Sequence, residues 1–255
     1  MLQTVFFGLH GLWLFSFYME QNYILYSCLR QWAADYHNSS FIADDPVQFP
    51  HRYTRKEDVE ISGLLTAVLS FGNRKQILKK ADELDAIMNH APLDYVLSGR
   101  WSDDFRADDE RSFYRMVSYA SFRHYFELLQ PVYAAGHDLE WALNSYGDGT
   151  PMQRLCRFLG VTEKSPQKKL NMFLRWMVRR NSEVDFGIWK SMSPSDLIIP
   201  LDTHVCRIAY QLGFIDSPSY SLSAARQITE ALRQVFPDDP CLGDFALFGY
   251  GVNHP

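Results

Sequence analysis

Apolar residues along this chain recur mainly three or four positions apart, which is the spacing of one face of a helix. Glycine and proline interrupt the pattern and mark where segments end. Few windows alternate with a period of two, as a half-buried strand requires. We therefore predict an all-α fold. The predicted helices cover residues 23–36, 60–71, 76–89, 112–136 (one or two helices), 138–146, 152–160, 167–180, 203–212 and 223–235, with 44–50 an extended connector and 94–97 a short turn.

The segment from Ile199 to Ala209 carries the clearest helix start, with the sequence I-P-L-D-T-H-V-C-R-I-A. Pro200 ends the preceding segment, and Asp202 then occupies an N-cap position before an apolar stripe. One interpretation of Asp202 is a structural cap that accepts backbone N–H bonds. The other is a carboxylate that the helix N-terminus keeps ionised and that points into a cleft. The pattern alone leaves both open.

The predicted helix of residues 167–180 has two unlike faces. Leu170, Phe173 and Met177 cluster on one side at 100° per residue, whereas basic residues cluster on the other. These basic residues are Lys168, Arg175 and Arg179. They form either the solvated face of an amphipathic helix or a stripe that lines a cleft or contacts phosphate. A lysine becomes a nucleophile only where desolvation or neighbouring cations lower its pKa.

Composition indicates a globular chain, because 47% of its 255 residues are hydrophobic and 15% are aromatic. The formal net charge of −5 is unusual for a nucleic-acid-binding protein, although a local basic stripe can still bind phosphates. The four cysteines include no C-x-x-C pair and the histidines include no H-x-x-x-H pair. We therefore predict no metal site and no cofactor. Scattered cysteines are typical of the reducing cytoplasm, where we expect the protein.

The first 18 residues are uncharged and rich in aromatic side chains. They have nearly the length of a membrane span, but no basic region precedes them. They are either the product of an upstream start codon, so that the natural protein begins at Met19, or a membrane anchor. We expect the first, and with it no membrane partner.

Four segments, in this order, resemble the helix-hairpin-helix (HhH-GPD) superfamily of base-excision DNA glycosylases. Residues 64–70 resemble its early helix, whose following loop reaches the lesion, and residues 245–251 resemble its last core helix. The run L-D-T-H-V-C-R at 201–207 is similar to the end of its catalytic signature, in which the aspartate is catalytic. The run K-K-L-N-M-F-L-R at 168–175 resembles the helix after the hairpin. The chain also shares "N-M-F-L-R-W-M-V-R" and "I-P-L-D-T-H-V" with an uncharacterised bacterial family within or beside this superfamily.

The resemblance implies two helical lobes that flank a cleft, one of residues 59–180 and the other of 19–58 with 181–255. It implies a monomer that binds damaged or abasic DNA and cleaves the N-glycosidic bond of a damaged base. Asp202 would be catalytic, and Lys168, at the place of the Schiff-base lysine, would add AP-lyase activity. The residues expected to bind substrate are Asn73, Arg74, Asn171, Arg175, Trp176, Arg179, His204 and Arg207.

The chain departs from the superfamily at the hairpin before Lys168. The glycine-rich "L-P-G-V/I-G" turn, which donates backbone N–H groups to a DNA phosphate, is replaced by T-E-K-S-P-Q at 162–167. A second hypothesis is therefore a non-catalytic helical scaffold, or a nucleic-acid-binding protein that kept the fold. The missing hairpin and the acidic net charge favour this alternative, whereas the Asp202 motif and Lys168 favour the enzyme.

Overall fold

Helices form nearly all the regular structure in residues 22–255, the part of the chain that the computed structural model describes. The predicted all-α fold is confirmed. Residues 22–36 are helical. The other helices are α2 (Lys56–Leu69), α3 (Arg74–Ile87), α4 (Pro92–Ser98), α5 (Trp101–Asp104), α6 (Tyr119–Ala134), α7 (Leu139–Asn144), α8 (Pro151–Leu159), α9 (Lys168–Val178), α10 (Thr203–Gln211), α11 (Leu222–Arg233) and α12 (Leu242–Asn253). The expectations for residues 1–18 and Met19 lie outside the described residues.

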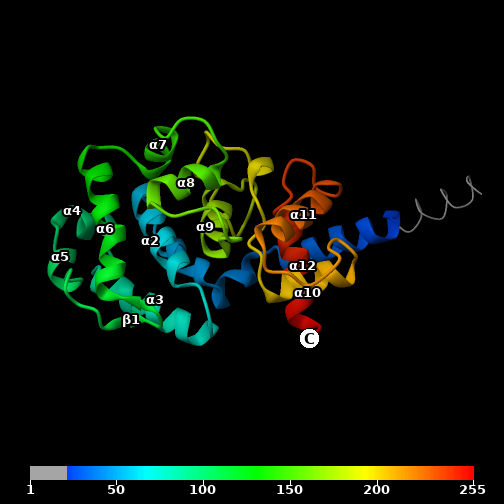
Figure 1. Ribbon diagram of the computed structural model, residues 1–255, viewed down its shortest axis with the longest axis horizontal. Helices are drawn as coiled ribbons and strands as arrows, with labels where there is room; N and C mark the ends of the chain where they lie inside the picture. The colour runs from blue at the N-terminus through cyan, green and yellow to red at the C-terminus, as the bar shows by residue number, and fades with distance from the viewer. Residues whose placement is uncertain (1–21) are drawn as a thin grey trace, which may run out of the picture.

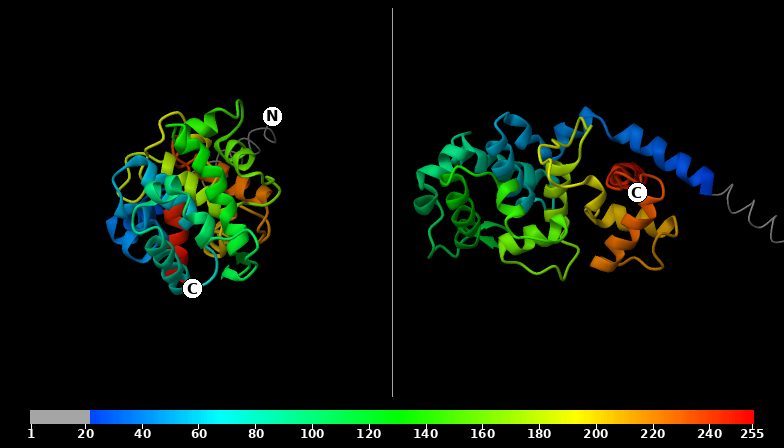
Figure 2. Two further views of the ribbon diagram at one scale, coloured as in Figure 1. Left: turned by 90° about the vertical axis from the view of Figure 1, so that its left-hand side faces the viewer. Right: turned by 90° about the horizontal axis from the view of Figure 1, so that it is seen from above.

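The helix α9 lies near the middle of the molecule, with α2–α8 on one side and α10–α12 on the other (Figure 1). It approaches α2 closely at Gly63, where an added Cβ would lie 3.0 Å from the Met177 side chain. On the other side, the helix of residues 22–36 passes beside α12 and crosses its direction (Figure 2), and Trp32 stacks on Tyr250 with ring centroids 3.9 Å apart. Residues from the start and the end of the chain therefore meet in one half of the molecule.

Capping residues and residues with positive φ define the two ends of α8 and the start of α9. Thr150 and Gln153 form a capping box at the start of α8, and Gly160 ends this helix in the left-handed conformation at φ 66°. The loop of residues 161–167 returns the chain, and Gln167 adopts φ 46° immediately before α9. Because these capping signals lie within a few residues of the helix ends, α8 and α9 lie close to the residue ranges that the sequence pattern predicts.

The predicted helix at 112–136 is wrong at its start, because a small hairpin occupies residues 112–118. Strand β1 (Ser112–Tyr114) pairs antiparallel with β2 (Val117–Ser118). Arg115 turns the chain at φ 54°, and the Ser118 hydroxyl then caps α6. Phe113 and Tyr114 are buried on this hairpin, and aromatic residues favour strands.

Two short connectors also differ from the prediction. Residues 44–50 are not extended but lie in the 3-10 turns η1 (Ser39–Asp44), η2 (Pro46–Gln48) and η3 (Pro50–Arg52). Proline is the first residue of η2 and of η3, where its fixed φ suits a helical turn. The turn at 94–97 is part of α4, which also begins at a proline and ends at Gly99 with φ 73°. The last 3-10 turn, η4, covers Pro194–Asp196.

Two of the three residues on the basic side of α9 are buried and not solvated. Arg175 and Arg179 are only 4% and 1% exposed. Both pair with Asp185, from the segment that follows α9. Arg175 also pairs with Asp244 of α12 at 2.6 Å, and Arg179 pairs with Asp239 at 2.7 Å. Charges removed from water require such partners, so these ion pairs hold α9 against α12.

Glu60 is a buried carboxylate that joins four parts of the fold. It accepts hydrogen bonds from the Tyr133 hydroxyl at 2.9 Å, from the Leu139 amide at 3.0 Å and from the Trp189 indole at 2.6 Å. These donors lie on α6, at the start of α7 and in the segment after α9. Burial raises the pKa of Glu60 to about 7.

Among residues 22–255, no helix has the length and apolar content needed to cross a membrane.

Glu60 makes stability depend on pH between about 4.5 and 7. In that range the unfolded carboxyl has lost its proton while the folded one keeps it, so the free energy of unfolding falls as pH rises. The expected loss is roughly 3 kcal/mol at full titration. Glutamine does not titrate in this range. We therefore expect the free energy of unfolding of Glu60→Gln, measured by urea denaturation at several pH values, to depend less on pH than that of the parent. Glu57→Gln, on the first turn of the same helix, is the control and should follow the parent. Equal slopes for Glu60→Gln and the parent would contradict the assignment.

Candidate active site

A cavity of about 760 Å³ opens where α2, α9, α10 and α12 come together. Its size is typical of a small-molecule or nucleobase site. Its wall comes from the turns η1 and η2, the loop after α2, the loop before α9 and the start of α10. The lining residues that carry charge or an aromatic ring are Phe41, Asp45, Phe71, Arg74, Lys168, Lys169, Arg175, Asp202, His204, Tyr220, Asp244 and Phe248.

Lys168 and Asp202 face each other in this cavity, with 3.7 Å between Lys168 Nζ and Asp202 Oδ2. Lys168 is the first residue of α9, and Asp202 is the N-cap of α10. The Asp202 Oδ1 atom accepts the Val205 amide at 2.9 Å, which confirms the predicted cap. One carboxylate thus caps α10 with one oxygen and approaches the amine with the other. The Lys168 side chain is 38% exposed and the Asp202 side chain 11%, so the pair is accessible from the cavity.

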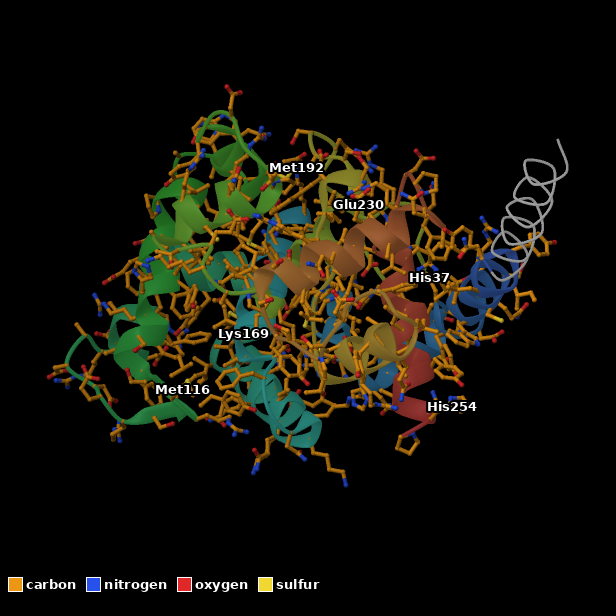
Figure 3. All side chains as sticks on the ribbon, turned by 45° about the vertical axis from the view of Figure 1, so that its right-hand side comes forward. His37, Met116, Lys169, Met192, Glu230 and His254 are labelled. Atoms are coloured by element: carbon orange, nitrogen blue, oxygen red, sulfur yellow. The ribbon has the colours of Figure 1, made fainter. Side chains whose placement is uncertain are left out.

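Lys169 is a second cavity amine that the sequence analysis did not select. Its Nζ lies 4.6 Å from the centroid of the Phe71 ring, in the middle of the molecule (Figure 3). Burial lowers the pKa of Lys169, and no carboxylate of residues 22–255 forms an ion pair with it. A desolvated amine is the more reactive kind, so Lys169 is a second candidate nucleophile. Only the contact with Phe71, far away in the sequence, distinguishes it from other helix lysines.

Two further carboxylates reach the cavity, and the sequence pattern pointed to neither. Asp244 pairs with Arg175, and burial raises the pKa of Asp244 to about 6. Asp45 caps η2 by accepting the Val47 amide at 3.0 Å, and burial raises its pKa also. In the described residues, no group of three or more His, Cys, Asp or Glu side chains is arranged to hold a metal ion.

Aromatic rings form much of the remaining wall. Phe41, Phe71, Tyr220 and Phe248 come from four separate segments. The His204 ring meets Phe248 edge to face, with centroids 5.8 Å apart. Flat rings of this kind can stack on a planar heterocycle. The sequence pattern does not join the four segments that carry these rings, so it could not bring them together as one wall.

Five of the ten residues predicted for the site line the cavity. They are Lys168, Asp202, Arg74, Arg175 and His204. The other five make contacts elsewhere in the fold.

Asn73 caps α3 by accepting the Gln76 amide, and Asn171 donates to the Pro166 carbonyl at 2.8 Å. Trp176 is fully buried. Arg179 pairs with Asp185 and Asp239, and Arg207 donates to the Gly251 and His254 carbonyls. Burial and these bonds keep all five side chains out of the cavity wall.

The loop between α8 and α9, residues 160–167, is held by its own side chains. Gln167 donates to the Thr162 carbonyl at 2.9 Å, and Glu163 pairs with Arg226 of α11 at 2.9 Å. Asn171 supports this loop by its hydrogen bond to the Pro166 carbonyl.

A comparison with protein families matches residues 45–253 to the family described as "Protein of unknown function (DUF2400)". The matched range contains every lining residue of the cavity except Phe41. Neither the curated proteins nor the solved structures gave a match to this chain.

Two substitutions separate the cap made by Asp202 from its charge. Asp202→Ala removes the acceptor of the Val205 amide, so we expect the free energy of unfolding to fall by about 1 kcal/mol. Asp202→Asn keeps an oxygen in the same place and should remain closer to the parent. Urea denaturation measures both. An Asp202→Ala protein as stable as the parent would show that the cap contributes nothing to stability.

Proposed function

The chain belongs to the DUF2400 family, and we propose that this protein is a DNA glycosylase that removes a damaged base, with an AP-lyase step through Lys168. The observation that carries the proposal is the distance of 3.7 Å between Lys168 Nζ and Asp202 Oδ2 in a cavity large enough for a base. The resemblance of residues 168–175 and 201–207 to the HhH-GPD glycosylases gives these two residues their roles.

In the proposed reaction, the Lys168 amine attacks C1′ of the deoxyribose. The new C1′–N bond forms as the glycosidic bond breaks, and the base leaves with the bonding electrons and takes up a proton. Positive charge develops on the sugar during this step, and the Asp202 carboxylate stabilises it. The proton lost by the amine passes to Asp202, which lies within reach. Opening of the sugar ring then gives an imine. Loss of a proton from C2′ to a base forms a C2′=C3′ double bond as the bond from C3′ to the 3′ phosphate oxygen breaks, and the phosphate leaves with the electron pair.

The wall of the cavity supports a base as the ligand. A base can enter only after it leaves the helical stack, and it then needs flat surfaces on both faces. Phe41, Phe71 and Phe248 offer such surfaces. Asp45 and Asp244 offer oxygens that accept from the N–H groups of a base, and Arg74 offers donors. Base recognition by these groups would select the lesion.

The alternative is a scaffold that kept the fold without catalysis. Two observations favour it: the net charge of −5, and a loop at 162–167 that carries Glu163 in place of the glycines. Such a protein would retain the Lys168–Asp202 pair as a structural contact only. It would not react with an abasic site.

Borohydride trapping tests the proposal, because it reduces the imine between an amine and C1′ to a stable covalent adduct. We expect the parent to form this adduct with at least one duplex from a panel that carries oxidised, deaminated, alkylated and abasic sites. Lys168→Ala should abolish the adduct, and Lys169→Ala should reduce it far less. Asp202→Asn should lower the rate roughly 100-fold or more, because it removes the group that stabilises the developing charge.

Lys169→Ala is the matched control, since it removes the neighbouring amine of the same cavity. If the adduct still formed with Lys168→Ala but not with Lys169→Ala, the nucleophile would be Lys169 and not Lys168. No adduct with any duplex, from a parent that is folded by circular dichroism, would contradict the lyase step through Lys168. If that parent also releases no base from any duplex, the glycosylase is contradicted and the scaffold is favoured.

A further inference from the structure

Three cations stand at the mouth of the cavity without an acidic partner, and we call them the mouth cluster: Arg74, Arg115 and Lys169. None of the three makes an ion pair or a side-chain hydrogen bond with residues 22–255. The chain has 30 acidic and 25 basic residues, and many of its other basic side chains are paired with carboxylates. In the mouth cluster, three cations that no carboxylate in the described part of the chain pairs with lie around one cavity.

The loop after α2 brings the mouth cluster together. Lys169 Nζ lies 4.6 Å from the centroid of the Phe71 ring, and Arg115 Cζ lies 5.8 Å from the same centroid. The Arg115 guanidinium also occupies the space beside Gly72. Arg74 is the first residue of α3, directly after this loop, and its Cζ lies 6.0 Å from the centroid of the Phe248 ring. The ring of Phe71 is thus flanked by two like charges that no carboxylate neutralises.

The β1–β2 hairpin that carries Arg115 is fixed against this loop. The Tyr114 hydroxyl donates to the Phe71 carbonyl at 2.8 Å. Met116, directly after Arg115, is 85% exposed at the turn of the hairpin. The hairpin therefore holds Arg115 at the rim of the cavity on a rigid support.

Like charges held close together repel, and an anion between them removes this cost. A nucleotide whose base occupies the cavity keeps its flanking phosphates at the mouth, where they would meet this cluster. The loop that would carry a glycine-rich phosphate hairpin instead carries Glu163, already paired with Arg226. We propose that Arg74, Arg115 and Lys169 bind the phosphodiester backbone of duplex DNA on either side of the extruded nucleotide, in place of that hairpin. This inference rests on the proposed function, because the base in the cavity positions the phosphates.

The salt dependence of DNA binding tests this inference separately from any chemistry. Binding of an undamaged duplex and of one with a tetrahydrofuran abasic analogue would be measured by fluorescence anisotropy at several salt concentrations. Each lost phosphate contact should reduce the slope of log K against log salt by about 0.9. Arg115→Gln should therefore weaken binding roughly tenfold at 0.1 M salt. The double variant Arg115→Gln/Lys169→Gln should lose about twice that slope.

Two matched controls remove cations of the same kind elsewhere. Lys79 is an exposed lysine of α3, a helix turn beyond the mouth, and Lys164 lies in the loop between α8 and α9. Lys79→Gln and Lys164→Gln should bind duplex as the parent does. If Lys164→Gln lost as much of the salt slope as Arg115→Gln, the loop between α8 and α9 would bind phosphate, and the inference would be overturned. The inference would also be overturned if the parent bound polyglutamate as tightly as duplex DNA, because the mouth cluster would then bind acidic chains in general.

The outcomes separate this inference from the proposed function. A parent that binds duplex through the mouth cluster but neither forms a borohydride adduct nor releases a base supports the cluster and contradicts the glycosylase. A parent that forms the adduct while the double variant keeps the full salt slope supports the glycosylase and overturns the cluster. Circular dichroism of each variant checks that a loss of binding does not come from unfolding.

Discussion

The buried ion pairs of α9 are the interaction on which the rest of the structure depends. Arg175 and Arg179 bring two charges into the interior, where desolvation is costly unless partners of opposite charge are in place. Asp185 joins both arginines, Asp244 ties Arg175 to α12, and loss of one buried partner typically costs about 3–5 kcal/mol. Since α9 begins at Lys168 and α12 lines the opposite wall, the same ion pairs set the width of the cavity.

The Lys168–Asp202 pair lies on helices whose positions these ion pairs help to fix. Each residue stands at the start of a helix, and the Asp202 cap holds its carboxylate in one orientation through the Val205 amide. A reacting sugar needs both groups at fixed positions, because a small displacement lowers the rate greatly. The proposed DNA substrate needs only a local basic surface despite the net charge of −5, and three cations without an ion pair to the described residues lie at the mouth of the cavity. The fold thus separates the chemistry inside the cavity from the proposed contact with phosphate at its rim.

Local signals in the sequence predicted the helices and the cap, whereas long-range contacts remained out of reach. The start of α10 follows from Asp202 and the apolar stripe after it, both within a few residues. The burial of Arg175 could not be predicted, because its partner Asp244 lies 69 residues away. The hairpin at 112–118 was missed since its aromatic residues are buried against Phe105 and Tyr119, which a local pattern does not identify. The closeness of Lys168 and Asp202 was implied only by a family resemblance.

The central claim is that Lys168 forms the covalent bond to the sugar while Asp202 faces it. The most direct test is peptide mapping by mass spectrometry of the borohydride-reduced adduct formed with abasic DNA. The account predicts that the added mass lies on Lys168, at the first residue of α9, and that Asp202→Asn lowers its yield without moving it. An added mass on Lys169, on the N-terminal amine or spread over several surface lysines would contradict the account.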